Sequence, residues 1–185
     1  MNDLESTIDT ILRSVFDALL EPARGVKFRR IQQVERLLRE YLDTVGEATL
    51  CPCNRTLLSG ERQWEPDGAF CRIMGADELF VALPFFVRQR APLVDPLLRR
   101  MLAQCVDTLV GVLVGDRLVS ADGRSDVLRD IRDALDDVLW ELNRAARDKR
   151  RAARRARAEA ETAKYRALVE AAVTRQRPVE EQPRE

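Results

Sequence analysis

Apolar residues return every three or four positions through most of the chain, and three stretches show this pattern most clearly. Residues 4–20 and 31–45 each carry a single apolar stripe, whereas residues 97–113 are apolar on more than one face. Such spacing is typical of amphipathic helices, and a helix that is apolar on several faces belongs inside a core. We therefore expect helices over about 4–20, 26–45 and 92–114, with the last at the centre of the packing.

Residues 47–73 interrupt this helical period. They contain Pro52, Ser59-Gly60, Pro66 and Asp67-Gly68, which are turn signals. The short runs on either side of Ser59-Gly60, residues 56–58 and 63–64, could pair as a hairpin. This stretch is therefore expected to be a small β or loop insertion, and it also holds three of the four cysteines.

The helical period resumes near residue 76, where Pro84 is expected to kink or split a short helix. A last helix is expected from about Asp126 to about Ala172, because Ala, Arg and Glu dominate there. About 45 helical residues extend on the order of 70 Å, so we expect its far half to project from the domain. Its first part carries a heptad seam, and beyond Lys149 only alanines continue the stripe. The seam consists of Leu128, Ile131, Leu135, Val138 and Leu142, and the alanines are Ala152, Ala156, Ala160, Ala163 and Ala167.

These patterns together predict a mostly α protein with one folded domain and an appendage. A hydrophobic fraction of 45% over 185 residues is enough for a sizeable core. We expect a bundle of about five helices over residues 1–143, with the Cys-bearing β or loop insertion at 47–73. A long projecting C-terminal helix then includes a basic helical arm over residues 144–177, called the arm below. Residues 178–185 are expected to be a disordered tail.

Charge changes at the same place as hydrophobicity. The 31 basic and 31 acidic residues cancel overall, but residues 1–143 have a net charge of −6 and residues 144–185 a net charge of +6. Between Arg144 and Arg157 stand eight cations and one acid, Asp148. The eight, called the cation cluster below, are Arg144, Arg147, Lys149, Arg150, Arg151, Arg154, Arg155 and Arg157. An acidic body with a basic arm indicates a polyanionic partner, or a body that covers its own arm.

The cation cluster predicts binding to nucleic acid or another polyanion. From Lys149 to Arg157 the cations are expected on nearly all sides of a helix, where they repel one another unless a polyanion is bound. The segment holds no Asn or Gln to read adenine, although arginine could still read guanine, so the contact is expected to be mostly sequence-neutral. Aromatic residues are missing from the arm except for Tyr165, so stacking on single strands is not expected. Two other interpretations stay open: a solvated helix end without a partner, and a nuclear-import signal in a cell that has a nucleus.

Self-association of the last helix is the alternative hypothesis. Its first half is acidic between Asp126 and Glu141, whereas its second half is basic. In an antiparallel homodimer each acidic half would lie beside the basic half of the second copy, which would set register and orientation. The chain would then be a protein–protein adaptor or scaffold.

The four cysteines leave several interpretations open. Four thiolates can hold one structural zinc ion, with Cys51, Cys53, Cys71 and Cys105 as the candidate ligands. Against this, close zinc ligands are usually spaced Cys-x2-Cys, and Cys105 lies on an apolar stripe where a small buried thiol is ordinary packing. Buried free thiols, a disulfide and a redox role are the other interpretations. The expected cofactor is therefore none, or one structural zinc.

The chain contains no histidine, which removes the most common general base and every Ser-His or Cys-His arrangement. Phosphate-binding glycine motifs are also missing. The longest apolar run, Leu109–Val114, is far shorter than the about 20 residues that a membrane span needs. Since the N-terminus does not resemble a signal peptide, we expect a soluble intracellular protein, cytoplasmic or nuclear, without a membrane partner. The predicted function is non-enzymatic binding or assembly.

Overall fold

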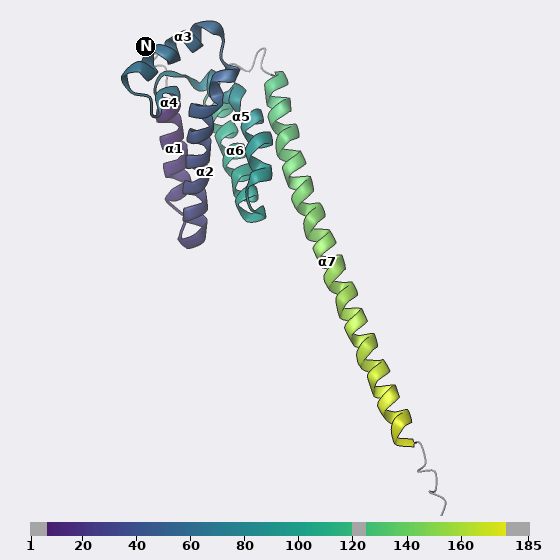
Figure 1. Ribbon diagram of the computed structural model, residues 1–185. Coiled ribbons are helices and arrows are strands. Elements are labelled where there is room, and N and C mark those ends of the chain that lie inside the picture. The colour runs from purple at the N-terminus through teal and green to yellow at the C-terminus, as the bar shows by residue number, and fades with distance from the viewer. Residues whose placement is uncertain (1–6, 120–124, 177–185) are drawn as a thin grey trace, which may run out of the picture. The chain divides into compact units, whose positions relative to one another are not determined.

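The computed structural model describes residues 7–119 and 125–176, and these residues form an all-α fold without a β-strand. The α-helical class predicted from the sequence is therefore confirmed. The described part contains seven α-helices, with one short 3-10 helix between α2 and α3 and another between α5 and α6 (Figure 1). Their bounds are α1 Ile8–Leu20, α2 Gly25–Thr44, η1 Gly46–Thr49, α3 Pro52–Trp64, α4 Ala69–Ile73, α5 Ala76–Arg90, η2 Ala91–Leu93, α6 Pro96–Gly115 and α7 Ser125–Gln176.

Helix α2 contacts α1, α4, α5 and α6, and α6, which was expected at the centre of the packing, contacts α1, α2 and α5. Figure 1 shows α1, α2, α5 and α6 side by side, with α3 and α4 at one end of the group. Their apolar stripes meet in one core, in which Phe16, Tyr41, Phe80 and Phe86 are at most 1% exposed. The rings of Tyr41 and Phe86 lie 5.4 Å apart, and Arg90 lies over the ring of Tyr41. The stripes predicted for residues 4–20, 26–45 and 92–114 therefore correspond to α1, α2 and α6.

The hairpin predicted inside residues 47–73 is wrong, because residues 52–64 form α3. Pro52 occupies the start of α3, where its missing N–H costs nothing and its fixed φ favours the helix. Leu58 is fully buried, and Gly60 faces open space, so the glycine weakens the helix without ending it. An ion pair between Arg62 and Glu47 also joins α3 to η1. Tertiary contacts thus stabilise a helix that the local turn signals disfavour.

Helix α4 is positioned by the last turn of α2. The Asp43 carboxylate accepts hydrogen bonds from the backbone N–H groups of Gly68, at 3.1 Å, and Phe70, at 3.3 Å. Gly68 has φ +72°, a conformation that glycine adopts at no steric cost. Gly46 allows the Phe70 ring to approach, since a Cβ at residue 46 would lie 2.9 Å from that ring. The segment expected to be irregular is therefore a packed pair of helices.

Pro84 does not split the helix predicted near residue 76, because α5 continues through it from Ala76 to Arg90. Proline lacks an N–H group and disturbs the turn that precedes it. The residues around it, Phe80, Leu83 and Phe86, are all fully or almost fully buried. Burial of these apolar side chains offsets the lost backbone hydrogen bond. The helix that follows also begins later than expected, at Pro96, where Asp95 caps its first turn.

Helix α7 has 52 residues and runs through the boundary between the two compact units of the chain, residues 1–142 and 143–185. Within the first unit, Ile131, Leu135, Val138 and Leu142 of the heptad seam are buried. Leu128 is partly buried and packs against the same core. An ion pair from Arg99 of α6 to Glu141, at 2.9 Å, joins this part of α7 to the body. The predicted tail, residues 178–185, lies outside the described residues.

Candidate polyanion interface and cysteine sites

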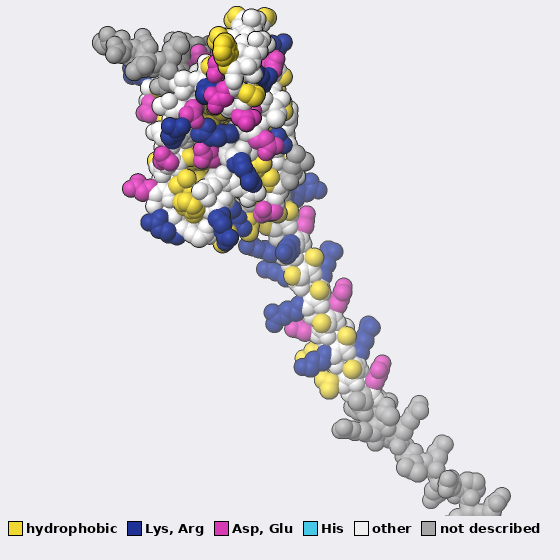
Figure 2. Space-filling model, turned by 60° about the vertical axis from the view of Figure 1, so that its left-hand side comes forward, with side chains coloured by type: hydrophobic (Ala, Val, Ile, Leu, Met, Phe, Trp, Pro, Cys, Tyr) yellow, Lys and Arg dark blue, Asp and Glu magenta, His cyan; other side chains and the backbone are white. Residues whose placement is uncertain are grey.

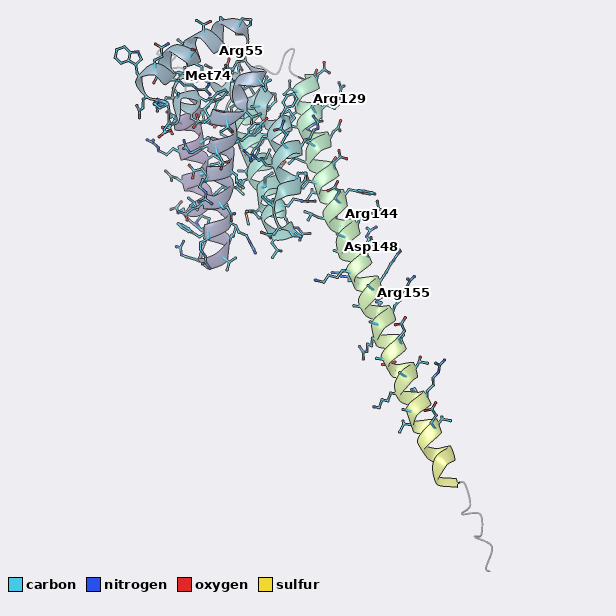
Figure 3. The ribbon with its side chains drawn as sticks, in the orientation of Figure 1. Arg55, Met74, Arg129, Arg144, Asp148 and Arg155 are labelled. Atoms are coloured by element: carbon cyan, nitrogen blue, oxygen red, sulfur yellow. The ribbon has the colours of Figure 1, made fainter. Side chains whose placement is uncertain are left out.

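All eight members of the cation cluster lie on α7, and all eight are exposed to solvent. Arg144, Asp148 and Arg155 follow one another along this helix in Figure 3. Figure 2 shows dark blue Lys and Arg side chains along the exposed helix, with yellow apolar side chains between them. Every described side chain from residue 143 to residue 170 is exposed, so no apolar core forms in this part of α7.

The helix sorts the cation cluster onto one face. At about 100° per residue, seven of its eight members fall within an arc of about 160°, and Lys149 alone lies outside it. The expectation that cations cover nearly all sides is therefore wrong. The opposite face carries the alanine stripe, Ala152, Ala156, Ala160, Ala163 and Ala167. The second unit thus presents a cationic face and a methyl face on a single helix.

Charges are compensated differently in the two units. In the first unit, Arg39 pairs with Asp9 at 2.7 Å and with Glu35 at 2.9 Å. In the second unit, Arg157 pairs with Glu161 at 3.5 Å, although both side chains are more than 60% exposed. Among the described residues, Lys149, Arg150, Arg151, Arg154 and Arg155 make no ion pair. These five cations are available to an external anion.

The cationic face ends in an exposed apolar patch that the sequence reasoning did not single out. Tyr165, Leu168 and Val169 are 70%, 58% and 62% exposed. Their spacing of i, i+3 and i+4 places them on one side of α7, in line with the cationic arc. The same spacing is visible in the sequence, but an apolar triplet within an Ala/Arg/Glu-rich helix does not stand out there. The triplet is called the Tyr165 patch below.

The structure does not bring the four candidate zinc ligands together. Cys51 and Cys53 are exposed near the start of α3, with their Sγ atoms 2.6 Å apart. Cys71 and Cys105 are buried in α4 and α6. Within the described residues, no group of three or more Cys, Asp or Glu side chains could hold a metal ion. The structure therefore gives no support to the predicted four-cysteine zinc site.

Burial makes Cys71 and Cys105 weak acids. Desolvation raises the pKa of each of these thiols to about 12. For Cys71 the neighbouring Asp43 raises the pKa further, and Arg39 opposes both effects. A thiol with so high a pKa is almost entirely protonated at neutral pH and is a poor nucleophile. These two cysteines are packing residues of the body.

Comparison of the chain with protein-family models, with curated proteins and with solved structures finds no match. No helix in the described part of the chain combines the length and the apolar composition needed to cross a membrane.

Proposed function

We propose that the protein is a non-enzymatic binding or assembly protein whose arm contacts nucleic acid or another polyanion. In this proposal residues 1–143 are a folded helical bundle, and residues 144–177 are the binding arm. The observation that carries the proposal is the cationic face itself, on which seven exposed Arg residues share one side of α7. A single extended cationic face suits a linear polyanion better than it suits a compact anion.

The dimensions of the cationic face fit a nucleic-acid backbone. The 14 residues from Arg144 to Arg157 extend about 21 Å along the helix. Duplex DNA carries one negative charge per about 1.7 Å of its axis. A duplex as long as this part of the helix therefore carries more phosphates than the cation cluster has cations. The major groove of B-DNA, about 12 Å wide, also accepts an α-helix with its side chains. Five or more phosphate contacts are therefore geometrically accessible to one helix.

Electrostatic repulsion within the arm supports the same proposal. Several cations of the arm are separated by three or four positions, including Arg147 and Arg151, and Arg150 and Arg154. Each such pair destabilises the helix by a few tenths of a kcal/mol. Because the described part of the arm offers few acids in return, a bound polyanion relieves this repulsion. The contacts would be sequence-neutral, since arginines directed at phosphates read no base.

Binding to random-sequence duplex DNA and RNA tests the proposal, measured at 50 and 200 mM salt. The full chain is compared with a chain that ends at Asn143, which keeps the first unit. We expect the full chain to lose affinity steeply with salt, with a slope of log K against log[salt] of about −4 to −5 for five phosphate contacts. The truncated chain should not bind. Absence of binding by the full chain at 50 mM salt would overturn the proposal.

Self-association through α7 is the second candidate function, and the Tyr165 patch is the observation that favours it. Exposed apolar side chains at this spacing are typical of a helix that receives a partner helix. The acidic residues between Asp126 and Glu141 would then pair with the cation cluster of a second, antiparallel copy. Charge complementarity of this kind sets both register and orientation.

Sedimentation of the full chain at low and high salt tests self-association. We expect a dimer at low salt that dissociates at high salt, because the complementary charges are screened. Replacement of Leu168 and Val169 by Ala should weaken the dimer, and Thr162→Ser is the matched control on the same helix. A monomer at every salt concentration would end this hypothesis without affecting the DNA and RNA measurement.

A further inference from the structure

Cys51 and Cys53 form a close pair of exposed thiols at the start of α3. Cys51 is the last residue before the helix, Pro52 begins it, and Cys53 is the second helical residue. Their Sγ atoms lie 2.6 Å apart, and both side chains are exposed. A disulfide bond is about 2.05 Å long, so a small side-chain movement is enough to join the two sulfurs.

The two thiols of this pair are not equivalent. The hydrogen bond that links them lowers the pKa of Cys51 and raises the pKa of Cys53. A backbone hydrogen bond at Asn54 lowers the pKa of Cys51 further. The position of Cys51 beside the free N–H groups of a helix start also favours a thiolate. These influences favour Cys51 as the nucleophile of the pair and Cys53 as the second thiol.

The surroundings of the pair leave room for an incoming molecule. Cys53 lines a shallow groove of about 480 Å³ together with Leu57, Gly60, Trp64 and Ile73. Leu57 and Trp64 are 57% and 89% exposed, so the groove is open to solvent. Cys71 and Cys105, by contrast, are at most 2% exposed. Of the four thiols in the chain, only Cys51 and Cys53 are therefore accessible to an oxidant.

We propose that Cys51 and Cys53 are a redox-active dithiol that reduces low-molecular-weight disulfides and closes to an intramolecular disulfide. The Cys51 thiolate attacks one sulfur of the small disulfide, forms a mixed disulfide, and releases the other half as a thiolate. Cys53 loses its proton to solvent and attacks the Cys51 sulfur, which forms the Cys51–Cys53 bond and releases the second half as a thiolate. The protein is oxidised by two electrons, and one small disulfide becomes two small thiols.

A metal-binding role explains the pair less well. A structural zinc ion takes four ligands, and the described residues offer no group of three around these cysteines. The thiol–disulfide reaction needs only the two sulfurs that are already adjacent. It is stoichiometric and uses no residue of the arm, so its failure would leave the polyanion proposal untouched.

Incubation of the native full chain with oxidised glutathione tests the dithiol. Free thiols are counted after unfolding, and attached glutathione is measured by intact mass. We expect the count to fall from four to two, with no glutathione attached and with full recovery on addition of dithiothreitol. Retention of four thiols, or stable glutathione on both Cys51 and Cys53, would overturn the proposal.

Single replacements identify the role of each sulfur. Cys53→Ser removes the resolving thiol, so we expect a stable mixed disulfide between glutathione and Cys51. Cys51→Ser leaves only Cys53, which lies inside α3 and not before its first free N–H groups, so glutathione should attach to Cys53 more slowly. Both positions are exposed, and an unchanged far-UV circular dichroism spectrum shows that each variant folds. Equal rates in the two variants would contradict the assignment of Cys51 as the nucleophile.

Discussion

The two halves of α7 are stabilised in different ways. From Ser125 to Leu142 the helix buries Ile131, Leu135, Val138 and Leu142 against the body, and Arg99 reaches Glu141 across the contact. From Asn143 to Glu170 every described side chain is exposed. The first half gains its stability from tertiary packing, whereas the second half depends on the helix propensity of alanine, arginine and glutamate.

This difference locates the surface on which a partner has most to contribute. In the body, arginines such as Arg39 and Arg62 already have carboxylate partners, so an external anion would compete with them. In the arm, five cations make no ion pair within the described residues, and their mutual repulsion remains. A polyanion bound to these five cations therefore replaces repulsion by attraction without breaking an ion pair of theirs.

Matched leucine replacements should show the largest difference between the two regions. Leu102 in α6 is fully buried, whereas Leu168 in the arm is 58% exposed. Leu102→Ala should lower the free energy of unfolding by about 2–5 kcal/mol, because it removes buried methyl groups and leaves a cavity. Leu168→Ala should change it by less than about 0.5 kcal/mol. Urea denaturation checks both values, and a large effect of Leu168→Ala would show that the arm belongs to the core.

The buried thiols should give the body a distinct pH dependence. The pKa of Cys71 and of Cys105 is raised to about 12 in the folded body. The free energy of unfolding is therefore unaffected by these thiols below their ordinary pKa, and it falls as the pH rises from that value towards 12. Ionisation of both thiols in the unfolded chain should lower the free energy of unfolding by about 3 kcal/mol between pH 8 and pH 10. In the double variant Cys71→Ala/Cys105→Ala this contribution should vanish. An equal fall in wild type and variant would refute the assignment.

Glycine replacements compare the two halves of α7 at the level of the backbone. Ala134 is 1% exposed in the first half, and Ala153 is exposed in the second. Each change to Gly costs about 1 kcal/mol of helix stability. Ala134→Gly should lower the urea midpoint of the whole body, whereas Ala153→Gly should only reduce hydrogen-exchange protection near residue 153. A lowered urea midpoint for Ala153→Gly would contradict the difference between the halves.

Periodicity was sufficient to predict α1, α2, α6 and α7, because their apolar residues recur at helical spacing. It failed at α3, where Pro52 and Ser59-Gly60 resemble turn signals. Leu58 is buried there and Arg62 pairs with Glu47, and these tertiary contacts outweigh the local preference. Such contacts join residues that are distant in sequence, so a local pattern could not reveal them.

The candidate site was predictable in its residues but not in its geometry. The cation cluster is evident from the charges along the sequence. Its concentration on one face follows only from the rotation of about 100° per residue in an α-helix, which places seven members on the same side. For the cysteines, sequence spacing predicted the geometry of one pair and not that of the other two. Cys51 and Cys53 are close in sequence and in space, whereas the places of Cys71 and Cys105 depended on how α4 and α6 pack. A shared zinc site therefore could not be decided from spacing alone.

The salt dependence of DNA binding tests the central claim most directly, with two variants that each lose four exposed charges. The arm variant replaces Arg150, Arg151, Arg154 and Arg155 by Gln. The body variant replaces Lys27, Arg29, Arg36 and Arg100 by Gln. We predict that the arm variant makes the slope of log K against log[salt] less steep by about 3 to 4, while the body variant leaves it unchanged within about 1. Equal slopes for both variants would contradict the claim that the arm is the binding surface.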